Sequence, residues 1–85
     1  MQPLNNEKSE NTLERRWGKG FSEDDYTFLE EEFKEWKNDN PTESKSHDVV
    51  LKEICHKQLE ISKLRANGNP VDGYVKELIN LLKML

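Results

Sequence analysis

FSEDDYTFLEEEFKEW, residues 21–36, is the stretch that decides the fold, because it predicts the helix around which the chain is organised. Ser22 is a suitable N-cap, since its hydroxyl accepts a hydrogen bond from an unpaired amide of the first turn. Asp25 lies three residues later, where a side chain reaches back to the cap, although Glu is the more usual residue there. Apolar residues then recur at helical spacing on one face: Tyr26, Leu29, Phe33 and Trp36. We therefore predict a helix from about Glu23 to Lys37 with one aromatic stripe and acidic remaining faces.

Two further helices are predicted after Pro41. The first begins by His47, behind a choice of caps, and continues to Ala66. The possible caps are Thr42, Ser44 and Ser46. Its apolar stripe consists of Val50 or Leu51, then Ile54, Ile61 and Leu64, with Cys55 beside it and Leu59 off it. The second begins with Asn69 as N-cap and Pro70 in the first helical position.

The short connection between these two helices favours an antiparallel hairpin. The aromatic stripe of the 23–37 helix would lie across it. The predicted fold class is therefore all-α, a small three-helix bundle. We expect residues 1–13 to form a mobile tail, with a short helical turn possible around residues 12–16, and residues 14–85 to form a single helical domain.

Composition and charge restrict the classes of function. The chain has 85 residues and a net charge of −4, and two Lys and eight acidic residues give residues 22–40 a charge of −6. Such an acidic helix would repel a phosphate backbone, so we do not expect wholesale nucleic-acid binding. The single cysteine, Cys55, is typical of a protein of a reducing cytoplasm. The N-terminus has no signal-peptide core, and no apolar run reaches the roughly 20 residues of a membrane span.

No catalytic, metal or cofactor site is expected. Cys55 and His56 are adjacent on a helix, where neighbouring positions do not face one another. A zinc site needs three or four ligands, and the chain offers only these two residues and His47. The acidic row of the first helix is expected to be a solvated face. Its members are Glu30, Glu31, Glu32 and Glu35. We therefore expect neither an enzyme nor a protein that binds a small-molecule substrate.

The last helix gives the strongest indication of a partner. Its end, LINLLKML (78–85), carries more apolar side chains than one neighbouring helix covers, unless the turn at Trp17–Phe21 packs on it. Exposed apolar area of this kind usually marks an interface. The predicted protein-interface residues are Val75, Leu78, Leu81, Leu82, Leu85 and Trp36.

A basic, aromatic cluster offers an alternative nucleic-acid site. It consists of Arg15, Arg16, Trp17 and Lys19. Arg and Lys contact phosphates, and an exposed Trp stacks on bases. The other interpretation is a structural turn in which Trp17 packs on the bundle.

Two runs together, WGKGFSEDDYTFLEEEFKEW (17–36) and LKEICHKQLEISKLRANGNPVDGYVKELINLL (51–82), resemble a domain of small proteins of bacteriophages and prophages of Gram-positive hosts. The resemblance covers about residues 17–82. It implies a link to phage genome packaging or replication for some members, and it assigns no activity and no functional residues to this chain.

The sequence thus predicts a phage-type protein-interaction module of the host cytoplasm, which self-associates or docks on a protein partner through its last helix. One alternative is a DNA-binding accessory factor of packaging or replication that uses the basic cluster. Another is an inhibitor of a host nucleic-acid-binding or defence protein, whose acidic helix imitates a phosphate backbone.

Overall fold

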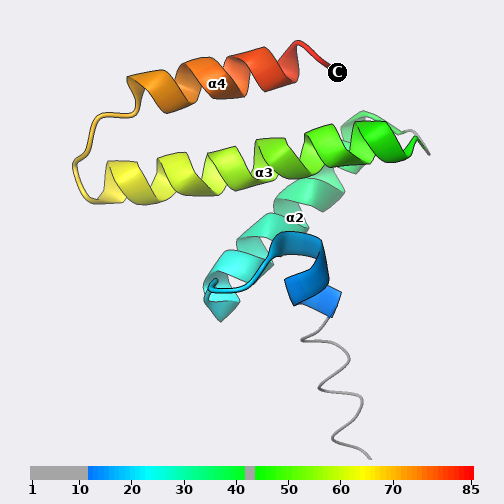
Figure 1. The fold of residues 1–85 in the computed structure, drawn as a ribbon, viewed down its shortest axis with the longest axis horizontal. Helices are drawn as coiled ribbons and strands as arrows, with labels where there is room; N and C mark the ends of the chain where they lie inside the picture. Colours follow the sequence, from blue (N-terminus) through cyan, green and yellow to red (C-terminus); the bar gives the residue numbers. More distant parts are fainter. Residues whose placement is uncertain (1–11, 42–43) are drawn as a thin grey trace, which may run out of the picture.

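The computed structural model describes residues 12–41 and 44–85, and this part of the chain is helical with no strand. Its three long helices are α2 (Glu23–Asp39), α3 (Lys45–Ala66) and α4 (Asp72–Leu82). Residues 12–17 form a further helical segment. The predicted all-α class is confirmed. Helix α2 extends two residues beyond its predicted end, and α3 begins at Lys45, which agrees with the predicted start by His47 (Figure 1).

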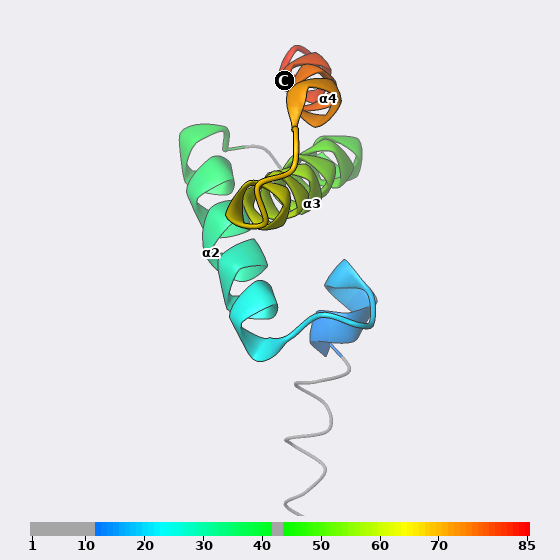
Figure 2. The ribbon, with the colours of Figure 1, turned by 90° about the vertical axis from the view of Figure 1, so that its left-hand side faces the viewer.

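Helix α3 is the central element. Helix α2 crosses it on one side, and α4 returns antiparallel along it, away from the segment 12–17 (Figures 1 and 2). The antiparallel hairpin of α3 and α4 is as predicted. The arrangement differs from the predicted three-helix bundle, because there are four helical segments in the described residues and α4 contributes no buried residue.

The start of α2 confirms the predicted capping box. The amide of Asp25 donates to Ser22 Oγ at 3.1 Å, and the amide of Ser22 donates to Asp25 Oδ2 at 3.1 Å. Lys63 of α3 also donates to Asp25 Oδ2, at 2.6 Å. This hydrogen bond lowers the pKa of Asp25. The cap therefore fixes both the first turn of α2 and its position against α3.

The start of α4 was predicted wrongly. The structure begins α4 at Asp72, behind Val71, without a side-chain cap. The reason lies in α3, which ends in a Schellman motif. Gly68 has φ 76° and donates to the carbonyl of Arg65, and the amide of Asn69 donates to the carbonyl of Leu64 at 2.9 Å. Asn69 thus belongs to the end of α3, and α4 begins three residues later without Asn69 as its cap.

The short helical turn expected around residues 12–16 corresponds to the helical segment 12–17. Residues 12 and 13 belong to the helical segment, and Leu13 packs against the core. The rest of the predicted tail, residues 1–11, lies outside the described residues. So does Thr42, one of the three predicted caps of α3; Ser44 is the N-cap, and its hydroxyl accepts from the amide of His47 at 3.4 Å.

The core lies between the segment 12–17, α2 and α3. Its buried cluster consists of Trp17, Leu29, Cys55 and Leu59. The partly buried residues packed around the cluster are Leu13, Phe21, Tyr26, Phe28, Phe33 and Trp36. Leu59, predicted to lie off the stripe of α3, is buried in this cluster together with Trp17. The aromatic stripe of α2 thus packs on α3 as predicted, whereas α4 lies outside this core.

Burial of Cys55 makes its titration a test of the core. Desolvation, with a smaller contribution from the charge of Glu32, raises the pKa of the Cys55 thiol from 9.0 to about 12. Between these two pH values, the folded state therefore keeps the thiol proton of Cys55, whereas the unfolded state has lost it. We expect the thiol's contribution to stability to be full below pH 9 and to be lost as the pH rises toward about 12.

Urea denaturation of the native protein and of Cys55→Ala across this pH range would measure this difference, because the alanine variant keeps all other titrating groups. We also expect a thiol reagent to modify the native protein far more slowly than the urea-unfolded chain. Equal modification rates in the two states would show that Cys55 is accessible.

Candidate protein-binding surface

Helix α4 is the most apolar helix of the chain and the least covered. Its half-exposed apolar side chains are Tyr74, Val75, Leu78, Leu81 and Leu82. Three others, on α4 or directly after it, are exposed: Ile79 at 46%, Met84 at 66% and Leu85 at 39%. Four of the predicted interface residues, Val75, Leu78, Leu81 and Leu82, are thus half-exposed, and the fifth on this segment, Leu85, is exposed.

A single lysine of α3 fixes one edge of α4. Lys57 Nζ lies 2.7 Å from Glu77 Oε1 and 5.3 Å from the centre of the Tyr74 ring. The hydrogen bond to Glu77 raises the pKa of Lys57. Because Lys57 also pairs with Glu60 of its own helix at 3.3 Å, it links two turns of α3 to the exposed edge of α4.

A groove runs along the other edge of α4, where it faces α2. Its apolar lining comes from Phe28 of α2, Ile61 of α3, and Val75 and Leu78 of α4. The polar lining residues are Glu32, Gln58, Ser62 and Arg65. Two predicted interface residues therefore line a depression to which all three long helices contribute. A second depression, on the Lys57 edge, includes Leu81 and Met84.

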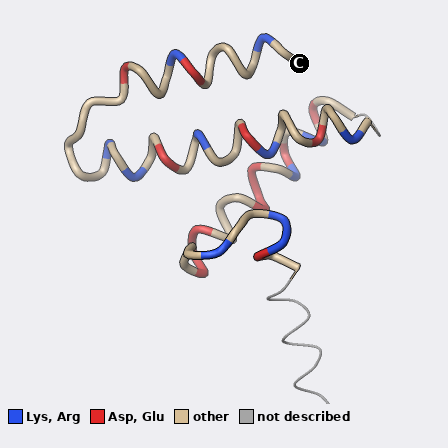
Figure 3. Tube along the Cα trace, viewed as in Figure 1, with Lys and Arg blue, Asp and Glu red and all other residues tan. Residues whose placement is uncertain are grey.

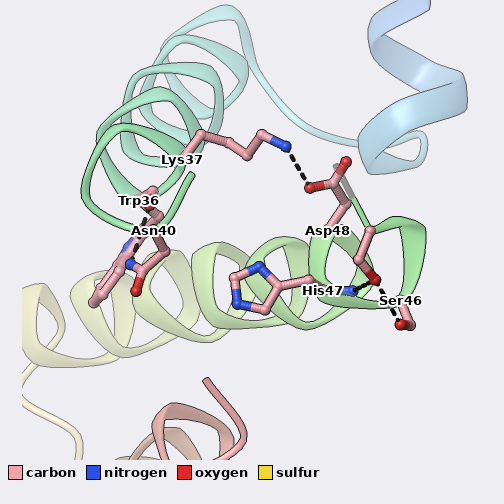
Figure 4. Close-up of polar contacts among 7 residues, drawn as sticks. Trp36, Lys37, Asn40, Ser46, His47 and Asp48 are labelled. Atoms are coloured by element: carbon pink, nitrogen blue, oxygen red, sulfur yellow. Dashed lines mark hydrogen bonds and ion pairs between the residues drawn. The ribbon is translucent and has the colours of Figure 1, made fainter. Parts of the chain in front are cut away.

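Trp36 does not belong to this surface as a free anchor. It is half-buried on α2, packs against the core cluster, and its indole N–H donates to Gln58 Oε1 at 3.0 Å. Figure 4 shows it at the end of α2, where the side-chain amide of Asn40 donates to its carbonyl oxygen at 3.1 Å. Nearby, Lys37 forms an ion pair with Asp48 at 2.8 Å, which joins the end of α2 to the start of α3. Trp36 is therefore part of the α2–α3 contact.

The predicted basic cluster is divided between the surface and the core. Arg15 and Lys19 are exposed. Arg16 forms an ion pair with Glu30 at 2.8 Å, and the indole N–H of Trp17 donates to the same carboxylate at 2.6 Å. The Trp17 ring is 3% exposed and lies edge-to-face with Phe33, with 5.8 Å between ring centres. The predicted stacking of Trp17 on bases is therefore wrong, because its ring faces the core rather than solvent.

The residues considered for chemistry are dispersed. Cys55 is buried in the core, whereas His56 Nε2 lies 2.9 Å from the carbonyl oxygen of Trp17. His47 Nδ1 is buried and has no hydrogen-bond partner among the described residues. No three His, Cys, Asp or Glu side chains in residues 12–41 and 44–85 gather as ligands of a metal ion would. In the same residues, no helix combines the length and the apolar character that crossing a membrane requires.

Glu30→Gln tests whether the Trp17 turn is fixed as described. This change removes the charge that accepts from Arg16 and Trp17, so we expect it to lower the free energy of unfolding by about 1–2 kcal/mol. Glu31→Gln, at the exposed neighbouring position, is the matched control and should change it by less than about 0.5 kcal/mol. Urea denaturation followed by tryptophan fluorescence measures both. Equal effects of the two substitutions would contradict the assigned role of Glu30.

The comparisons with known proteins relate the chain to a prophage. A family described as the YonG second domain matches residues 21–85. The chain is 38% identical over 66 residues to the SPbeta prophage-derived uncharacterized protein YonG of Bacillus subtilis (strain 168). That match covers 78% of this chain and 22% of the relative, so the chain spans about a fifth of the relative's length. No solved structure matches the chain. The resemblance to a prophage family of Gram-positive bacteria is thus confirmed, and the chain belongs to the family of the YonG second domain.

Proposed function

We propose that this chain is a non-enzymatic interaction module, which docks on a protein surface through the apolar face of α4. The single observation that carries the proposal is that the most apolar helix has no buried residue. Apolar side chains exposed together on one helix are typical of a surface that a partner covers. We place its action in the cytoplasm of the bacterial host, where a lone thiol such as Cys55 remains reduced.

The family supports a role as one module among others. The prophage relative is much longer than this chain, and the matching region is described as a second domain. A small helical domain with one uncovered apolar face is suited to joining larger components, because apolar burial stabilises most protein association. The relative is uncharacterised, so the identity of those components is not part of the proposal.

The alternative of a DNA-binding accessory factor has less support. Of its four predicted residues, Trp17 is buried and Arg16 is engaged by Glu30, which leaves Arg15 and Lys19 exposed. Two separate surface charges provide little phosphate affinity. The acidic-inhibitor alternative rests on the exposed carboxylates of α2, which a solvated face explains equally well.

Ile79→Glu tests the docking surface, because it places a charge on the exposed apolar edge of α4 without removing a buried side chain. We expect the variant to keep its helical circular dichroism. As bait in a Bacillus subtilis lysate, it should lose proteins that the unchanged chain captures. Thr27→Glu adds the same charge at an exposed position of α2 and should leave capture unchanged. Identical capture by all three proteins would exclude α4 as the docking surface.

A further inference from the structure

We infer that the partner on α4 is a second copy of this chain, and that the two α4 helices pair antiparallel about a two-fold axis. This inference rests on the proposed function, because it names the occupant of the same surface. It is drawn from the charges at the two ends of α4, from the apolar residues between them, and from the location of the remaining negative charge.

The outer edge of α4 carries opposite charges at its two ends. Asp72, Lys76, Ile79 and Lys83 recur at steps of four, three and four, so they share one edge of the helix. Asp72 and Lys83 are exposed and make no ion pair among the described residues, whereas Glu77 is held by Lys57. Two charges of opposite sign at the ends of one exposed helix are self-complementary if that helix meets its own copy head to tail.

Antiparallel pairing brings these charges together. Asp72 lies six residues before Leu78 and Lys83 lies five residues after it. A two-fold axis level with Leu78 therefore places Lys83 of one copy within about one residue, or ~1.5 Å along the axis, of the level of Asp72 of the other. Symmetry repeats the pair, so a dimer contains it twice. Parallel pairing would instead bring Asp72 against Asp72 and Lys83 against Lys83.

The apolar contact lies between the charged pairs. By helical spacing, Val75 and Leu82 lie beside Ile79, on the side of α4 that is nearer α2, and Val75 borders the groove that Phe28 and Ile61 line. The half-exposed side chains on this side and the exposed Ile79 are the ones that the second copy would cover. The groove lies directly beside the paired helices, so it would receive apolar side chains from the second copy.

The distribution of charge favours a copy over a strongly charged partner. The region 22–40 carries −6, whereas residues 70–85 carry two acidic and two basic residues and are neutral. Figure 3 shows both signs along α4, and Figure 2 shows α4 at the opposite end of the molecule from the first turns of α2. Two copies that meet through α4 therefore bring neutral faces together. A basic partner would be attracted to α2 instead.

The size of the contact indicates a weak dimer. Helix α4 has 11 residues, so its length is about 16 Å. Stable interfaces bury roughly 800 Å² per partner, which a helix of this length reaches only with help from the groove. We therefore expect association that depends on concentration rather than a permanent dimer.

A charge exchange tests the pairing. Asp72→Lys and Lys83→Asp each turn both ion pairs into like-charge pairs, so each variant alone should dimerise about tenfold more weakly at low salt. An equimolar mixture of the two variants forms a heterodimer in which both pairs are again opposite in charge, and its association should return to that of the unchanged chain. The double variant Asp72→Lys with Lys83→Asp should also dimerise normally. Sedimentation velocity over a range of concentrations measures all of these.

The control is Lys34→Asp, which makes the same charge change at an exposed position of α2. This position lies outside the proposed pairing, so its effect on dimerisation should be small. The inference would be overturned if the unchanged chain stayed monomeric at every concentration. It would also be overturned if the mixture of Asp72→Lys and Lys83→Asp associated no better than either variant alone. If the chain is monomeric while Ile79→Glu still loses captured proteins, the dimer is excluded and the docking function stands.

Discussion

The buried indole of Trp17 is the contact on which the rest of the structure depends. The indole N–H donates to Glu30 of α2, and the backbone carbonyl oxygen of Trp17 lies 2.9 Å from His56 Nε2 of α3. The next carbonyl, that of Gly18, accepts from the hydroxyl of Tyr26 at 2.7 Å. The turn is possible because Gly18 has φ 103°, which is accessible to glycine and strained for other residues. One short turn is thus hydrogen-bonded to both helices, and it closes the core at one end of α2.

The position of this core explains why α4 is uncovered. Six of the seven Phe, Trp and Tyr residues gather around Trp17, α2 and one side of α3, and Tyr74 of α4 is the exception. A chain of 85 residues has few large side chains left for a second core. α3 therefore has a well-covered side and a side covered by α4 alone. The apolar surplus of α4 follows from this division, because α4 packs mainly on α3 and meets α2 only across the groove that Phe28 lines.

Local chemistry made part of this fold predictable. The capping box at Ser22 and Asp25 and the end of α3 at Gly68 depend on a few neighbouring residues, so the sequence is sufficient to locate them. The start of α4 was missed because Asn69 and Pro70 form an equally good helix start when read alone. Only the three-dimensional structure shows that the end motif of α3 extends to Asn69 and that α4 begins three residues later. The burial of Leu59 likewise depends on Trp17, which is distant in the sequence and lies in the same buried cluster.

The candidate site, too, could be predicted from the sequence only in part. An excess of apolar residues on the last helix is visible in its composition, and this identified α4. The separation of Trp36 from that surface depends on how α2 crosses α3, which no local pattern encodes. Trp17 was ambiguous because basic neighbours are typical of both a binding cluster and a turn. The carboxylate of Glu30, 13 residues further along the chain, decides between the two.

The attachment of α4 by its apolar stripe and by Lys57 has a consequence for how the molecule unfolds. Helix α4 has no buried residue of its own, whereas α2 and α3 both have buried residues, and proteins open first where buried apolar side chains are few. We therefore expect α4 to open locally, so that its amides exchange with solvent while α2 and α3 remain closed. Covering α4 would suppress this opening, so association through α4 and order within it are thermodynamically coupled.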